Sequence, residues 1–315
     1  MPITLPPLNR RSFVKSAIAF GIGGSIPSFL FDSIAFGETV QRSPECWILA
    51  SDTHVSELPD TRQQNAAFQT MVRDISQLPT QPTGMIISGD CAVLQGKIGD
   101  YKQIIEYLKP LRESGIKIHA ALGNHDNRQN FLQAFPEVTP TKKNPRLKVK
   151  AVRNDDSTNN TKQVDVIETK HANWFILDSL AKTNETPGSF GKQQLTWLAD
   201  ELDARREKPA LIIAHHNPDV LVGQGLLDTA DFAKVIQPRP QVKAYIYGHT
   251  HFWGTSRMDN LHIINLPSTA WLFNDNAVLA WVVATLHEKG ITLELKTIDK
   301  KDKRNNTKVE INYDG

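Results

Sequence analysis

Short apolar runs and amphipathic segments alternate along this chain from residue 46 onward. Residues 46–50, 85–87 and 116–122 are apolar runs that end at polar residues or glycine, and they predict buried strands. Between them, apolar side chains recur every three or four residues over 68–78 and 101–111, which predicts amphipathic helices. Strands that alternate with helices predict a parallel sheet with right-handed crossovers.

The second half of the chain continues this alternation and then changes it. Further buried strands are predicted at 174–178, 211–214 and 244–247, with a helix over 195–202. After residue 260, three apolar segments follow one another without a helix between them, at 261–266, 278–285 and 291–298. We expect these three segments to be consecutive antiparallel strands, because antiparallel strands need no helical crossover.

The composition fits one folded domain. The chain has 315 residues, of which 40% are hydrophobic, enough for a single sizeable core. We place the domain at 45–298, with a polar excursion over 136–170 and a polar tail at 299–315. The net charge is only +2 and no basic stripe with interleaved aromatic residues stands out, so binding to nucleic acid is not expected.

Residues 1–37 read as an export signal rather than as part of the fold. Arg10 and Arg11 precede an apolar stretch over 17–36 that is interrupted by glycines and Pro27. This pattern resembles a twin-arginine signal, which implies the twin-arginine export machinery as a partner and the periplasm as the destination. Small residues near Gly37 favour cleavage there. The alternative is a retained membrane anchor, for which the glycines and Pro27 make a poor spanning helix.

Residue types that bind metals follow most of the predicted strands. Six of the ten histidines lie in these short segments, a concentration that scattered core histidines would not produce. In open α/β sheets the carboxyl ends of the strands are where ligands bind, so we expect these side chains to gather at one edge. They are Asp52 and His54, Asp90, Asn124 and His125, His215 and His216, and His249 and His251.

The mixture of carboxylate, amide and imidazole groups predicts a site for two divalent metal ions. Oxygen and nitrogen ligands together suit Mn, Fe or Zn, and these residues accept any of the three. One carboxylate can bridge two ions about 4 Å apart, which then hold a phosphoryl group jointly and lower the pKa of a bound water.

Five sequence blocks carry a resemblance to a known family. They are Asp52-Thr53-His54, Gly89-Asp90, Gly123-Asn124-His125-Asp126, His215-His216 and Gly248-His249-Thr250-His251. In this order, each after a predicted strand, they resemble the calcineurin-like metallophosphoesterases. The likeness is greatest to the bacterial branch that includes cyclic-nucleotide and glycerophosphodiester phosphodiesterases. That branch often has His-His-Pro-Pro where this chain has His215-His216-Asn217-Pro218.

The resemblance implies an α/β (α+β) fold: a four-layer αββα sandwich of two mixed β-sheets with the metal site at the strand tips. It implies three ligands for each metal and one shared carboxylate. The first metal has Asp52, His54 and His251, the second has Asn124, His215 and His249, and Asp90 bridges them. A tyrosine that binds iron in the purple acid phosphatases is replaced by Val93, so tyrosinate-bound iron is not expected.

The resemblance also implies roles beyond metal binding. His125 resembles the family's catalytic histidine, which stabilises the transition state or protonates the leaving group without binding a metal, and Asp126 would orient its imidazole. Asn124, Arg128 and His216 are the expected substrate contacts. Arg128 has the alternative of pairing with a carboxylate on its own helix, and His216 that of an ordinary loop residue.

The expected function is hydrolysis of a phosphate ester, in first place a phosphodiester, by a hydroxide that bridges the metals. A broad phosphomonoesterase with the same site is the alternative. A non-catalytic binding protein of the same fold is less favoured, because the ligand set is complete. The aromatic residues near the last block are expected to pack in the core rather than to stack on a substrate base. They are Phe252, Trp253, Trp271 and Phe273.

Overall fold

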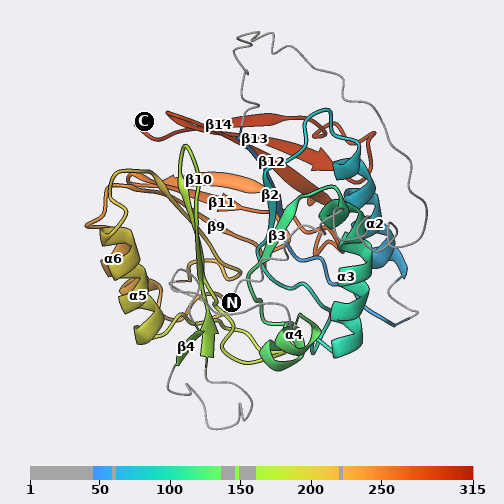
Figure 1. Ribbon diagram of the computed structural model, residues 1–315, viewed down its shortest axis with the longest axis horizontal. Helices are drawn as coiled ribbons and strands as arrows, with labels where there is room; N and C mark the ends of the chain where they lie inside the picture. Colours follow the sequence, from blue (N-terminus) through green and yellow to red (C-terminus); the bar gives the residue numbers. More distant parts are fainter. Residues whose placement is uncertain (1–44, 59–61, 136–145, 149–160, 220–222, 315) are drawn as a thin grey trace, which may run out of the picture.

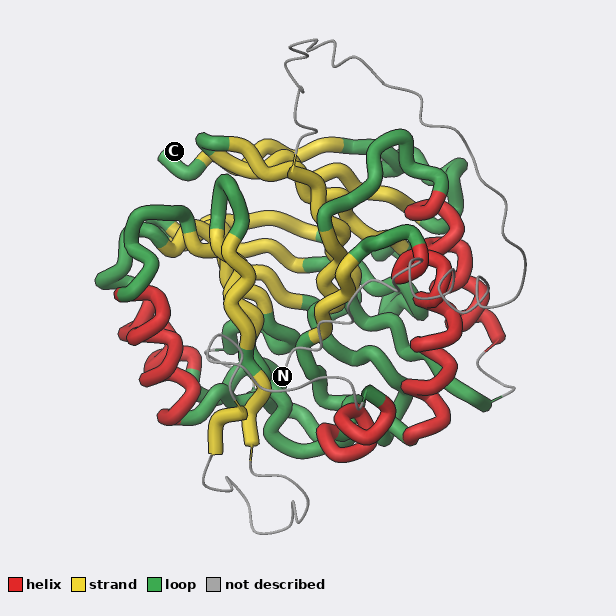
Figure 2. The backbone as a smooth tube through the Cα atoms, viewed as in Figure 1, coloured by secondary structure: helices red, strands yellow, loops and turns green. Residues whose placement is uncertain are grey.

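The computed structural model describes residues 45–314, apart from 59–61, 136–145, 149–160 and 220–222. Two six-stranded sheets lie face to face, with helices at the two outer sides (Figure 1). Figure 2 shows the strands in the middle of the molecule and the helices to either side. The expected four-layer αββα sandwich of two mixed sheets is confirmed.

The first sheet joins the two ends of the domain, in the order β14-β13-β12-β1-β2-β3. Its parallel half is β1 (Glu45–Ala50), β2 (Gly84–Ile87) and β3 (Lys117–Ala120). The crossovers are α2 (Arg62–Ser76) and α3 (Ile98–Glu113). Its antiparallel half is β12 (Ala280–His287), β13 (Gly290–Thr297) and β14 (Lys308–Asn312).

The second sheet has the order β10-β11-β9-β8-β7-β6. Parallel pairs join β7 (Asn173–Ile176), β8 (Ala210–Ile213), β9 (Val242–Tyr247) and β11 (Leu261–Asn265). The antiparallel edges are β6 (Asp165–Glu168) and β10 (Gly254–Met258). Its helices are α5 (Lys192–Asp203) and α6 (Thr229–Ile236), and the short α4 (Arg128–Ala134) follows β3.

The hydrophobic core has three layers, and strands such as β1, β2, β7, β8 and β9 each contribute to two of them. In β1, Cys46, Ile48 and Ala50 face the layer that contains α2 and α3. Trp47 and Leu49 face the second sheet. A third layer lies between the second sheet and helices α5 and α6. Burial on both faces explains why these strands read as continuous apolar runs in the sequence.

The polar excursion expected over 136–170 is shorter than its sequence suggested. Within it, β4 (Arg146–Lys148) and β5 (Thr161–Gln163) form an antiparallel pair. Residues 162–166 are buried, and β6 joins the edge of the second sheet. Lys162 tolerates burial because its ammonium donates to the carbonyls of Leu180 and Ser189. Lys162, Gln163 and Asp165 are therefore buried polar residues of β5 and β6 and not part of an exposed excursion.

The C-terminal strands differ from expectation in two ways. Residues 261–265 form β11, which pairs in parallel with β9 rather than antiparallel with the strand after it. The segment 299–315 is no tail, because residues 308–312 form β14 and Ile311 and Tyr313 are buried between the sheets. An alternating apolar pattern indicates a strand but does not identify the strand with which it pairs. The last strand, β14, was not recognised in the sequence because a polar turn separates it from β13.

The export-signal interpretation of residues 1–37 lies outside the described residues. Among the helices that the structure describes, none combines the length and the apolar character needed to cross a membrane.

The burial of Ile311 yields a test of the extended domain boundary. Ile311→Ala leaves a cavity against the inner faces of the two sheets, so the free energy of unfolding should fall by roughly 2–5 kcal/mol. The neighbouring Asn312 is exposed, and Asn312→Ala should change it little. Urea unfolding of both variants measures the free energy of unfolding. Equal stability of the two variants would mean that the C-terminal segment does not contribute to the folded domain.

Candidate metal centre

Five loops at one edge of the two sheets bring the predicted metal-binding residues together. They follow β1, β2, β3, β8 and β9, each at the carboxyl end of its strand. Two groups of three side chains have ligand atoms that all lie within 4.8 Å of one another. The first group is Asp52, His54 and His251, and the second is Asp90, His215 and His249.

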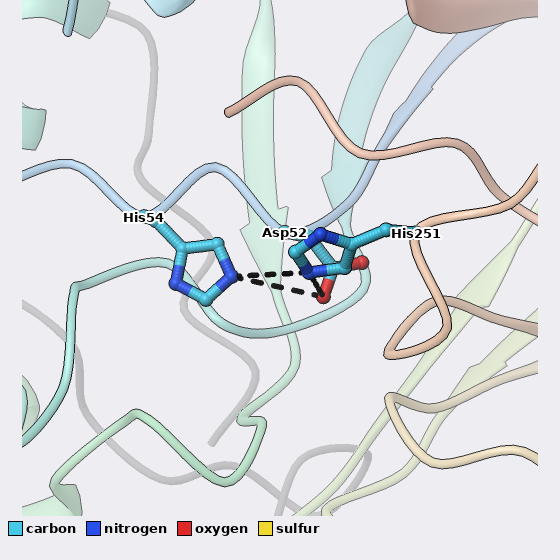
Figure 3. A group of neighbouring side chains, drawn as sticks. All are labelled: Asp52, His54 and His251. Atoms are coloured by element: carbon cyan, nitrogen blue, oxygen red, sulfur yellow. Dashed lines mark hydrogen bonds and ion pairs between the residues drawn. The ribbon is translucent and has the colours of Figure 1, made fainter. Parts of the chain in front are cut away.

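The first group converges on one carboxylate oxygen, as Figure 3 shows. The Oδ1 atom of Asp52 lies 3.2 Å from His251 Nε2 and 4.0 Å from His54 Nε2. The two Nε2 atoms lie 3.3 Å apart. All three residues are buried, so the three atoms enclose a small polar space.

The second group adjoins the first through Asp90. Its Oδ2 atom lies 3.3 Å from His215 Nε2 and 3.8 Å from His54 Nε2, so it faces a histidine of each group. The amide oxygen of Asn124 lies 3.2 Å from the same His215 nitrogen. Asn124 therefore belongs to the second group by position.

The backbone of these loops is bent sharply to deliver the side chains. Five of the six grouped residues have positive φ angles between 39° and 66°: Asp52, His54, Asp90, His249 and His251. Non-glycine residues rarely adopt this conformation, and such strain persists where the surrounding structure imposes it. Gly123 allows the loops to meet, because a Cβ there would lie 2.2 Å from Asp90 Oδ1.

Hydrogen bonds orient two side chains of the first group. Asp52 Oδ2 accepts from Ser51 Oγ at 2.5 Å, and the His249 backbone N–H is shared between Oδ2 at 3.0 Å and Oδ1 at 3.2 Å, while Oδ1 faces the histidines of the group. His251 Nδ1 donates to the Trp271 carbonyl at 2.9 Å, so its Nε2 carries a lone pair. Such outer hydrogen bonds fix the tautomer and orientation of metal ligands.

The ionisation of the site fits cation binding. Burial alone would raise the pKa of both carboxyls, yet His251 and His215 lower the pKa of Asp52, and His215 and His54 lower that of Asp90. Burial lowers the pKa of His54 to about 3 and that of His249 to about 4. The site therefore offers ionised carboxylates and, in His54 and His249, neutral imidazoles, the forms that bind metals.

His215 differs from the other histidines of the groups. Although burial lowers its pKa, the carboxylates of Asp90 and Asp52 outweigh burial and raise it to about 9. Without a cation, a proton on His215 compensates the two buried carboxylates. A divalent ion would displace that proton and supply the positive charge itself. The residues present thus fit two divalent ions.

His125 lies beside the groups, but Asp126 does not orient it as expected. The Nδ1 atom of His125 donates to the carbonyl of Leu94 at 3.0 Å, and Leu94 itself has a positive φ of 52°. The Asp126 carboxylate accepts instead from the backbone of Cys91, Ala92 and Gly123 and from the hydroxyl of Tyr101. It ties the β2 and β3 loops together. A backbone acceptor leaves no sequence signal, so Leu94 was missed.

Arg128 and His216 also differ from the expected substrate contacts. Arg128 is buried and forms two hydrogen bonds with the Asp178 carboxylate, at 2.8 and 3.0 Å. The partner comes from the end of β7 and not from the helix of Arg128. His216 is fully buried, its Nδ1 lies 2.8 Å from Ser179 Oγ, and burial lowers its pKa well below the usual range. It is a neutral side chain behind His215 and His249.

The aromatic residues after the last block are not all core residues. Phe252 and Phe273 are exposed, and Trp271 is half-buried with its ring stacked on His54. Core packing describes Trp253, which contacts the layer between the sheets. For Phe252 the available signal was its position directly after His251, whereas Phe273 lies far from that block in the sequence and had no such signal.

Comparisons with known proteins agree with this geometry. Residues 48–252 match the family model described as Calcineurin-like phosphoesterase. The 3′,5′-cyclic adenosine monophosphate phosphodiesterase CpdA of Vibrio vulnificus is 24% identical over 249 residues, which cover 74% of this chain and 81% of that protein. The probable glycerophosphodiester phosphodiesterase GpdQ of Arcobacter nitrofigilis is 24% identical over 232 residues, covering 70% and 77%.

Solved structures share the fold. A dimetal phosphatase from Danio rerio superimposes with a TM-score of 0.60 at 14% identity, covering 86% of this chain and 99% of that one. A purple acid phosphatase from yellow lupin gives a TM-score of 0.59 at 14% identity, covering 87% and 55%. Because the family model spans most of the folded domain and its ligand types recur at the strand tips, the chain belongs to the calcineurin-like phosphoesterase family.

Proposed function

We propose that this phosphoesterase acts on phosphodiesters and that its two groups of buried side chains hold two divalent metal ions. Hydrolysis of phosphate esters is the reaction of the family to which the chain belongs. The proposal specifies the kind of ester and the residues that act on it. The observation that carries it is the pairing of Arg128, the cation expected to contact the phosphate, with the buried carboxylate of Asp178.

The metal roles follow from the distances within the groups. Asp52, His54 and His251 would hold one ion, and Asn124, His215 and His249 the other. Asp90 faces histidines of both groups, so its carboxylate would bridge the ions. Bound there, the two ions would neutralise charge on the phosphate and lower the pKa of a coordinated water.

His125 would act on the leaving group. Its Nδ1 proton is held by the Leu94 carbonyl, so the reactive nitrogen is Nε2, and the half-buried ring gives that nitrogen access to substrate. As a general acid the ring would carry a second proton on Nε2, transfer that proton to the departing ester oxygen and return to its neutral form, and water would restore the Nε2 proton afterwards.

The preference for diesters follows from the charges around the groups. A monoester dianion has an additional charged oxygen and gains from cationic donors beyond the metals. Arg128 is paired with Asp178, Lys162 lies 3.8 Å from the same carboxylate, and His216 is neutral. A diester has one fewer charge and depends less on such donors. The similar bacterial proteins named as phosphodiesterases support the same preference.

If Asp90 bridges the two ions, its substitution should release both of them, whereas substitution of His125 should release neither. Asp90→Ala should lose both ions and nearly all activity, because it removes the carboxylate between the groups. His125→Asn is the matched control, adjacent to a proposed ligand but not one itself. It should keep both ions while its rate falls roughly 10²–10⁴-fold, as expected for a general acid. Metal analysis of purified protein decides, and two ions per chain in Asp90→Ala would refute the bridge.

The substrate preference is measured directly with paired esters. With Mn²⁺ supplied, kcat/KM should be higher for bis(p-nitrophenyl) phosphate than for p-nitrophenyl phosphate, because few cations remain for the second charge of the monoester. Both substrates release the same phenolate, so the leaving group is constant, and measuring the pair in Phe273→Ala as well removes the contribution of that ring to binding of the second nitrophenyl arm of the diester. A tenfold advantage of the monoester would favour a phosphomonoesterase and leave the metal groups as proposed.

We also propose that the chain is exported by the twin-arginine route, on the pattern of Arg10, Arg11 and the weakly apolar stretch after them. Arg10→Lys combined with Arg11→Lys should leave the protein in the cytoplasm, because the arginine pair is read by a receptor. Fractionation of cells that express the wild type and the double variant tests this. Equal export of both would point to a different signal or an anchor.

A further inference from the structure

The loop after β11 places two aromatic rings against the histidines of the first group. The indole of Trp271 stacks on His54, with ring centroids 4.1 Å apart and planes at 19°. The ring of Phe273 stacks on His251, with centroids 4.2 Å apart and planes at 21°. Each imidazole therefore has one face covered by an aromatic ring, in the offset-stacked range.

The two rings differ in what lies on their other side. Trp271 is half-buried, whereas Phe273 is 64% exposed, the highest value among the exposed large hydrophobic residues that the structure describes. Leu272 beside it is 37% exposed, and Phe252, which directly follows His251, is 46% exposed. Apolar side chains that gather beside a polar site mark a surface that a ligand covers.

The position of Phe273 indicates which chemical group of a ligand would contact its ring. Its ring lies against an imidazole of the first group, so the ester arms of a phosphate held at the two groups come within its reach. The face turned away from His251 is the part available for contact. An aromatic face gains most from a second flat ring, because stacking combines apolar burial with favourable ring electrostatics.

We propose that Phe273 is a stacking platform that selects phosphate esters with a flat aromatic group, such as a nucleobase, on one ester arm. The proposal rests on the proposed function, because the phosphate must bind at the two metal groups. Leu272 and Phe252 would extend the apolar surface around the bound ring. Base–aromatic stacking of this kind changes affinity by about 5- to 100-fold on alanine substitution.

The experiment measures recognition of the base without assuming which ester is hydrolysed. Adenosine 5′-monophosphate and ribose 5-phosphate carry the same phosphate and sugar, and they differ in the base. Each is used as a competitive inhibitor of the full, Mn²⁺-loaded enzyme, with whichever nitrophenyl ester is turned over as the reporter. The ratio of their two inhibition constants reports the contribution of the base, and the KM of the reporter cancels from it.

Wild-type enzyme should bind the base-bearing inhibitor more tightly. Phe273→Ala should weaken that inhibitor about 5- to 100-fold and leave ribose 5-phosphate unchanged, while Phe273→Trp should retain the preference. Met258→Ala removes an equally apolar, 50% exposed side chain from β10 and should change neither constant. Metal content should stay the same in all variants.

Two results would overturn the proposal: no preference for the base in the wild type, or an unchanged ratio of the two inhibition constants in Phe273→Ala, which includes equal weakening of both inhibitors. Equal weakening with metal loss would instead make Phe273 a cover for His251. These outcomes do not depend on whether the diester or the monoester is hydrolysed faster, so a failure of the platform is distinguishable from a failure of the diester preference.

Discussion

The arrangement of the loops at the site depends on two buried carboxylates, those of Asp52 and Asp90. Burial opposes their ionisation. The adjacent Ser51 hydroxyl donates to Asp52, and the facing imidazoles and backbone N–H groups contribute the rest of the stabilisation of the two charges. Those partners come from loops far apart in the sequence, so the charges can be compensated only when both sheets are in place. The positive φ angles of the loop residues are sustained because the strands beneath them are buried on both faces.

The same compensation shapes what surrounds the centre. Positive charge near the groups is either shared with a carboxylate, as in Arg128 with Asp178, or absent because burial keeps an imidazole neutral, as in His216. Asp126 accepts two hydrogen bonds from the β2 loop, one from its own loop after β3 and one from Tyr101 of α3, and burial together with Asp90 raises its pKa to about 6. Rigid loops with little spare positive charge leave the recognition of ester arms to apolar neighbours such as Phe273.

The buried strands and the gathering of the metal-binding residues could be predicted from local patterns in the sequence, whereas the four-layer arrangement of two sheets was implied by the resemblance to a known family. A strand buried on both faces is a short apolar run, and a ligand at its carboxyl end is the next polar residue, as Asp52 is after β1. What failed depends on tertiary partners. The bond from His125 goes to a backbone carbonyl, Arg128 meets a carboxylate fifty residues away, and β14 follows a polar turn. No local periodicity encodes such pairings.

The pairing of β1 with β12 governs the order in which this chain can fold. Ile48 lies opposite Val283, so one edge of β1 has no strand to bond until more than two hundred further residues have been made. At roughly 5–20 residues per second, synthesis leaves that apolar edge without its partner for ~10 s or longer. During this interval β1, β2 and β3 present an open edge that can pair with other chains. A cellular factor that shields exposed strands would therefore matter most for this protein before its last strands appear.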